Sequence, residues 1–166
     1  EAVQKTSCRI YDTRKTVPGW RLLDKYAVRC GGGYNHRMGL YDMIMLKENH
    51  IAYAEGIKKA IQQTQAYLKE NKLTIPVEIE TQNIQEVKEV LECGGVDRIM
   101  LDNYSIEDLK KAISLIDKRY ETEASGGVNL TTIREIAKTG VDFISVGAVI
   151  HHATSLDLSL KAVLHE

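Results

Sequence analysis

A regular alternation of short apolar runs and longer amphipathic segments constrains this chain more than any other feature. The apolar runs are centred near residues 79, 99, 123 and 144, so they recur about every 20 to 24 residues. This spacing accommodates a strand, a short loop and a helix. Because strands joined through helices run parallel, the second half of the chain is predicted to be a series of βα units.

Two earlier apolar runs, at residues 9–11 and 43–46, bring the predicted strands to six. We expect helices over residues 22–28, ended by the glycines at 31–33, and over residues 52–70. Six parallel strands predict an α/β fold, an incomplete parallel (β/α) barrel, because a complete barrel has eight. Either the barrel is incomplete, or sequence outside this chain supplies the remaining strands.

Helix starts are legible in the second half of the chain. Asn83 precedes Glu86 by three positions, and Ser105 precedes Asp108 by the same distance. A polar cap followed by an acid satisfies free N–H groups in the first helical turn. We therefore predict that helices begin just after Asn83 and Ser105.

Length and composition indicate one ordinary globular domain spanning residues 1–166. A formal net charge of −1 argues against a general nucleic-acid or membrane-surface role, and no apolar stretch suits a bilayer span. Three scattered cysteines predict reduced thiols and a cytoplasmic location. The chain begins at Glu1 without Met, in what resembles the tail of a helix over residues 1–6, so we expect a domain cut from a longer protein.

Acidic side chains stand at the ends of two neighbouring strands. Glu80 ends one apolar run and Asp102 follows the next, with Glu78 on the same strand face as Glu80. Carboxylate oxygens suit Mg²⁺ bound to a diphosphate, or they stabilise positive charge directly. The structural alternative is that these acids simply pair with Lys15 or Lys47.

Basic side chains crowd the first fifty residues. Arg14, Lys15 and Lys47 stand at strand ends, and the glycine loop at 31–33 is predicted to be mobile and to deliver His36 and Arg37. Neighbouring cations repel unless an anion lies between them, so a polyanionic substrate is expected. The alternative is a solvated surface charge at each position, which we favour for Arg21, Lys25 and Arg29.

Two glycine-containing loops predict a phosphate site. Ser125, Gly126 and Gly127 lead from a strand toward a helix near Thr131, and Gly147 precedes a turn at His151. Backbone N–H groups at such positions bind phosphate, and in βα barrels the last two loops are the usual place. The alternative is that the glycines only turn the chain. His50 and His165 are expected to be structural.

In these motifs the chain resembles the quinolinate phosphoribosyltransferases, also called nicotinate-nucleotide pyrophosphorylases (carboxylating). The resemblance covers almost the whole chain, in order. It rests on residues 12–16, 18–19, 21, 32–33, 35–37, 39–40, 42, 46–50, 77–80, 100–103, 125–127 and 145–148.

The resemblance implies the barrel portion of a type II phosphoribosyltransferase. Such an enzyme transfers the phosphoribosyl group of 5-phosphoribosyl 1-diphosphate to quinolinate, releasing diphosphate and CO₂ and forming nicotinate mononucleotide for NAD biosynthesis. It implies catalytic roles for Lys15, Glu80 and Asp102, the two acids also lying near Mg²⁺, the expected cofactor. The implied quinolinate ligands are Thr13, Arg14, His36, Arg37 and Lys47. The implied phosphate ligands are Ser125, Gly126, Gly127, Gly147 and His151.

The resemblance also implies an N-terminal α/β domain that covers the barrel mouth of a neighbouring subunit and supplies an arginine to it. We expect that domain to be absent from this chain, so that the isolated piece is inactive or severely impaired. A homodimer or higher homo-oligomer is the expected assembly of the full-length protein, without nucleic-acid or membrane partners.

Three other interpretations remain open at this point. The first is a paralogous protein linked to molybdenum transport that acts on another acceptor. The second is a non-catalytic anion-binding domain, which has no need of Lys15, Glu80 and Asp102 at strand ends. The third, a phosphate-binding barrel isomerase or synthase, is disfavoured by the order of the motifs.

Overall fold

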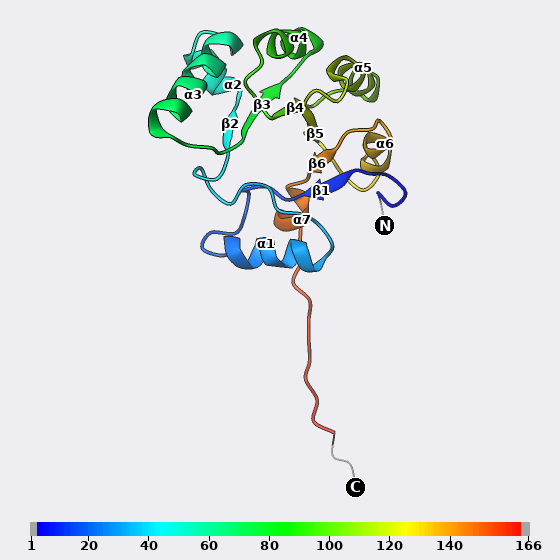
Figure 1. Ribbon diagram of the computed structural model, residues 1–166. Helices are drawn as coiled ribbons and strands as arrows, with labels where there is room; N and C mark the ends of the chain where they lie inside the picture. The colour runs from blue at the N-terminus through cyan, green and yellow to red at the C-terminus, as the bar shows by residue number, and fades with distance from the viewer. Residues whose placement is uncertain (1–2, 164–166) are drawn as a thin grey trace.

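The computed structural model describes residues 3–163, and a curved parallel sheet forms its centre (Figure 1). The sheet has six strands in the order β1-β6-β5-β4-β3-β2, and every hydrogen-bonded neighbour is parallel. The strands are β1 (Arg9–Tyr11), β2 (Ile44–Leu46), β3 (Val77–Thr81), β4 (Arg98–Asp102), β5 (Glu121–Ser125) and β6 (Phe143–Ser145). The predicted α/β fold with six parallel strands is confirmed.

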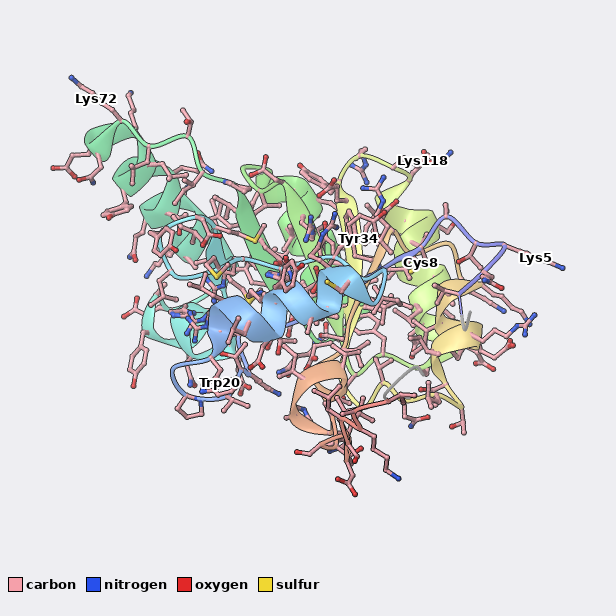
Figure 2. All side chains as sticks on the ribbon, turned by 90° about the horizontal axis from the view of Figure 1, so that it is seen from below. Lys5, Cys8, Trp20, Tyr34, Lys72 and Lys118 are labelled. Atoms are coloured by element: carbon pink, nitrogen blue, oxygen red, sulfur yellow. The ribbon has the colours of Figure 1, made fainter. Side chains whose placement is uncertain are left out.

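Helices alternate with the strands, and several of them cover the outer side of the sheet (Figure 1). They are α1 (Arg21–Cys30), α2 (Glu48–Tyr53), α3 (Ile57–Asn71), α4 (Ile84–Cys93), α5 (Ile106–Ile116), α6 (Ile133–Ala137) and α7 (Ala148–His151). Seen from below, α1 lies in front of the sheet, with Trp20 near its N-terminal end (Figure 2). None of the described helices is both long enough and apolar enough to cross a membrane.

The two faces of the sheet have opposite character. Side chains such as Ile79, Ile99 and Ile144 are fully buried between the strands and the outer helices, where they form the hydrophobic core. Side chains alternate along a strand, so the intervening positions face inward. Those positions carry charge, with Glu78 and Glu123 fully buried. An apolar core therefore holds the strands from outside, while buried charges lie among the inward-facing side chains.

The predicted capping residues act as expected. The Asn83 side chain accepts a hydrogen bond from the Glu86 N–H, and Ser105 accepts one from the Asp108 N–H. These bonds satisfy donors in the first turns of α4 and α5, which begin at the next residues. The caps thus set where both helices start, and with them the lengths of the loops at the strand ends.

The single helix predicted over residues 52–70 is wrong. The segment divides into α2 and α3, because Glu55 and Gly56 adopt positive φ angles of 63° and 127°. Glycine reaches such angles without steric cost, so Gly56 was the available signal. The predicted helix tail over residues 1–6 is wrong for residues 3–6, which form a turn, and residues 1 and 2 lie outside the described part.

Candidate active site

One cavity of about 1000 Å³ lies at the ends of the strands. By alternation, its walls include inward-facing residues such as Met45, Met100 and Ser145. Every residue that the sequence placed in a functional site also lines it. These residues are Thr13, Arg14, Lys15, His36, Arg37, Lys47, Glu80, Asp102, Ser125, Gly126, Gly127, Gly147 and His151. Cations, acids and glycine loops from separate βα units therefore share one space, as parallel strand ends require.

Two arginines form a cationic part of the cavity wall. Arg14 follows β1, and its Nε atom is buried without a hydrogen-bond partner within residues 3–163. Arg37 donates from Nη1 to the Met43 carbonyl at 3.0 Å. Burial and the nearby charge of Arg14 lower the pKa of Arg37. Two like charges this close, one with an idle buried donor, provide a site that suits an anion.

The acids at the strand ends have different partners. Glu80 forms an ion pair with Lys47, so the structural alternative holds for this acid, although both residues line the cavity. Asp102 accepts hydrogen bonds from Ser125 Oγ at 2.5 Å and from Asn103 Nδ2 at 2.7 Å. Asp102 is thereby oriented by neutral donors and forms no ion pair within residues 3–163.

The glycine loops lie against the charged residues. A Cβ atom at Gly147 would lie 2.8 Å from His151 Nε2 and 3.5 Å from Lys15 Cδ, so the absence of a side chain lets the last loop approach both. Gly126 has a φ of +87°, and a Cβ there would collide with the side chain of Asn103. Both positions thus need glycine for close backbone approach, which a bound phosphate also requires.

A buried charge cluster lies deeper in the sheet interior. His36 Nε2 is 3.0 Å from Glu78 Oε2 and 3.4 Å from Glu123 Oε2. Arg98 donates from Nη1 to Glu123 at 3.0 Å, and its guanidinium stacks on the Phe143 ring at 4.1 Å. His36, Glu78 and Glu123 also form the one group of metal-ligand type found within residues 3–163. Arg98 already neutralises Glu123 there, so this geometry favours ion pairing over a metal.

The charges in this cluster depend on one another. Burial and the charge of Glu123 raise the pKa of Glu78 to about 7. Burial lowers the pKa of His36, while hydrogen bonds and charges from Glu123 and Glu78 raise it. The His36 ring and the Glu78 carboxyl, 3.0 Å apart, therefore compete for a proton. His36 Nδ1 accepts the Arg37 N–H at 2.8 Å, which leaves no room for a proton on Nδ1 and favours the carboxyl of Glu78.

Two expectations about the first fifty residues are wrong. Lys25 is not a solvated surface charge, because it is buried and its Nζ lies 2.5 Å from Asp12 Oδ1. The loop that carries His36 is not held loosely. The His36 backbone N–H donates to Asp12 Oδ1 at 2.8 Å, and the His36 carbonyl accepts a hydrogen bond from Lys25 Nζ at 2.9 Å. Asn35 donates to the other Asp12 oxygen at 2.6 Å, so Asp12 anchors the whole segment.

Sequence reasoning missed the anchoring role of Asp12 and Lys25, and the pairing of Glu123 with Arg98. Glu78 and Glu123 stand at alternate positions of apolar strands, which signals charge on an inward face. Nothing in the spacing indicates which cation each acid would meet. His50 is structural as expected, because its Nδ1 accepts the Lys47 N–H at 3.0 Å at the start of α2. His165 lies outside the described residues.

The model of the family described as "Quinolinate phosphoribosyl transferase, C-terminal domain" matches residues 1–161. The chain belongs to this family. A quinolinate phosphoribosyltransferase [decarboxylating] 2, mitochondrial, from Nicotiana glauca is 51% identical, with 92% of this chain and 47% of the relative covered. A probable nicotinate-nucleotide pyrophosphorylase [carboxylating] from Bacillus subtilis is 44% identical, with 94% of this chain and 53% of the relative covered.

Solved structures of proteins with the same name have a similar fold. The nicotinate-nucleotide pyrophosphorylase from Francisella tularensis has 44% identity and a TM-score of 0.88, covering 95% of this chain and 55% of that one. The corresponding protein from Pyrococcus furiosus, at 18% identity and a TM-score of 0.69, shares the fold. The chain thus spans about half the length of the curated relatives it matches.

Proposed function

We propose that this chain carries the catalytic site for phosphoribosyl transfer from 5-phosphoribosyl 1-diphosphate to the ring nitrogen of quinolinate. The products are nicotinate mononucleotide, diphosphate and CO₂. The names of the relatives support this reaction, and one observation within the chain carries it. The idle buried Nε of Arg14 lies beside Arg37, in the same cavity as Glu80 and Asp102. A dicarboxylate acceptor and a sugar carbon that becomes positive need that combination.

The cationic wall would bind the acceptor. An arginine fork pairs with a carboxylate through two parallel N–H bonds, so Arg14 and Arg37 suit the two acids of quinolinate. Lys47 would add a third cation by exchanging its present partner Glu80 for the substrate. Thr13 lies beside them and accepts the Lys15 N–H at 3.0 Å, which shapes the loop after β1.

The acidic wall would act on the sugar. Breaking the bond to diphosphate builds positive charge on the ribose carbon, as in other oxocarbenium-like transition states. Glu80 and Asp102 would stabilise that charge, and Lys15 would meet the leaving diphosphate. Ser125, Gly126, Gly127, Gly147 and His151 would hold the 5-phosphate of the sugar.

The donor set fits Mg²⁺ as a cofactor bound together with the diphosphate. Glu80 and Asp102 offer hard carboxylate oxygens from the neighbouring strands β3 and β4. They would hold the ion directly or through water, which Mg²⁺ readily retains. When bound, the ion neutralises charge on the departing diphosphate.

Decarboxylation would follow the transfer. Loss of the carboxylate next to the ring nitrogen leaves a carbanion, and only the quaternised pyridinium nitrogen stabilises that charge. Arg14 and Arg37 would hold the ring while CO₂ departs. In this order, the two acids lower the barrier to phosphoribosyl transfer. The positive ring formed in that step then lowers the barrier to decarboxylation.

Activity of the 166 residues by themselves is expected to be low, because the related enzymes are about twice as long. A homodimer in the full-length protein remains a prediction. Cytoplasmic location also remains a prediction. The name of the bacterial relative gives no compartment, and plant relatives are named mitochondrial or chloroplastic.

Calorimetry tests the proposal without requiring turnover. Quinolinate should bind more tightly than nicotinate, and Arg14→Ala should weaken quinolinate binding by roughly 10- to 100-fold, the loss of a charge-assisted contact. Arg134→Ala, on the exposed surface of α6, is the matched control and should leave the affinity unchanged. Equal affinity for the two pyridine acids would contradict a site built for two carboxylates.

Two further measurements separate this reaction from the alternatives. Lys47→Ala should weaken quinolinate binding and leave the fold intact, because Lys47 is half exposed. Binding of 5-phosphoribosyl 1-diphosphate should strengthen when Mg²⁺ is added. A non-catalytic anion-binding domain would not require this dependence on Mg²⁺. Preference for another acceptor over quinolinate would favour the molybdenum-linked paralogue.

A further inference from the structure

His36 has no ring nitrogen left for a ligand. Its Nε2 is bonded to Glu78 at 3.0 Å, and its Nδ1 accepts the backbone N–H of Arg37 at 2.8 Å. The side chain is 4% exposed, so solvent and substrate reach only an edge of the ring. A cationic His36 would place a proton on Nδ1, directly against the Arg37 N–H. The contacts therefore fit a neutral ring that links two protein groups.

The two groups that the ring links belong to different parts of the fold. Glu78 belongs to β3 and is fully buried, beside Glu123 of β5. Arg37 is in the loop between α1 and β2 and lines the cavity. Because the His36 backbone is itself held by Asp12 and Lys25, the ring is fixed at both ends. The ring therefore fixes the position of Arg37, which lines the cavity, relative to strand β3.

We propose that His36 is a positioning residue, whose imidazole fixes the Arg37 peptide to Glu78 and so places the Arg37 guanidinium for an acceptor carboxylate. This inference rests on the proposed function for the identity of the acceptor. It departs from the role of direct quinolinate ligand that the family resemblance implies for His36. The acid beneath the ring gains a role too, since Glu78 supplies the acceptor that orients Nε2–H.

Two substitutions separate the ends of the ring. In His36→Asn the short amide retains an acceptor near the Nδ1 position, whereas in His36→Gln the longer amide retains a donor near Nε2. The Asn variant should therefore keep its affinity for quinolinate but lose stability, because Glu78 loses a buried donor. The Gln variant should keep more stability but bind quinolinate roughly 3- to 10-fold more weakly, the loss of one hydrogen bond that places Arg37.

Calorimetry with quinolinate and with 5-phosphoribosyl 1-diphosphate measures both affinities, and denaturant unfolding measures stability. Affinity for the donor should not change in either variant, because the His36 ring bonds to Glu78 and Arg37 and to none of the predicted donor ligands. A purely structural role would lower both affinities together. Equal, large losses of quinolinate affinity in both variants would mean that His36 contacts the ligand, and would overturn the inference.

Nitrogen-15 NMR of the unsubstituted chain provides a test that needs neither a variant nor binding. At pH 7 the His36 ring should carry a proton on Nε2 and none on Nδ1, with a hydrogen-bond coupling to the Arg37 amide. Protonation of both nitrogens would overturn the inference. If the chain failed to bind quinolinate at all, the proposed function would fall, while the NMR result would still decide the role of His36.

Discussion

Replacing Lys25 by Met should strongly destabilise this fold. Lys25 is 1% exposed and its ammonium group contacts the Asp12 carboxylate and the His36 carbonyl. Met fills similar space without charge, so the change isolates the electrostatic effect from packing. The substitution leaves a fully buried carboxylate without its cation.

The magnitude follows from what remains around Asp12. Removing one partner of a buried ion pair costs about 3 to 5 kcal/mol. The N–H groups of His36 and Asn35 still donate to the carboxylate, which keeps the expected loss near the lower end, about 3 kcal/mol. For a domain of this size that corresponds to roughly 10 °C in Tm.

Urea unfolding followed by circular dichroism measures the free energy of unfolding. Adding Asp12→Asn to Lys25→Met should recover part of the loss, because no buried charge then remains unpaired. Lys111→Met is the matched control. It breaks an exposed ion pair with Asp108 and should leave the free energy of unfolding unchanged within error. A loss below about 1 kcal/mol for Lys25→Met would refute the reasoning that this buried pair anchors the loop.

Gly126→Ala should destabilise more than Gly140→Ala. Both glycines have φ near 90°, but of the two only Gly126 would place a Cβ against a neighbour, Asn103, among the described residues. Gly140→Ala should therefore show the backbone cost alone, about 1 kcal/mol in the free energy of unfolding measured with denaturant. Burial raises the pKa of Cys8 to about 12, so the thiol should resist labelling by an aromatic disulfide reagent at pH 8 while exposed Cys30 reacts. This raised pKa contributes stability that is complete below pH 9 and lost as pH rises toward 12. An unfolding free energy that declines equally in Cys8→Ala would contradict the assignment.

Local sequence determined where the elements begin and how they alternate. The caps at Asn83 and Ser105 and the apolar runs of β3 to β6 depend on neighbours along the chain, so they could be predicted. The break at Gly56 was missed, because a single glycine inside an amphipathic pattern is tolerated in many helices. The three cysteines are free, as their spacing predicted.

The membership of the site was also predictable, because parallel strands place their carboxyl ends on one edge. Arg14, Lys47, Glu80 and Asp102 each follow an apolar run, and all of them line one cavity. This geometric part is confirmed. The roles assigned to these residues stay predictions until binding is measured.

Only the tertiary structure decided which charges meet. The sequence by itself established a parallel α/β layer with charged strand ends, because periodicity and capping are short-range properties of the chain. The pairing of Lys25 with Asp12, of Glu80 with Lys47 and of His36 with Glu78 joins residues 13 to 42 positions apart. Such pairings depend on the curvature of the sheet and on burial, since a charge taken out of water binds the nearest partner that the fold provides. His36, expected from the sequence to be a cationic ligand, is for this reason bonded at both ring nitrogens to other parts of the protein.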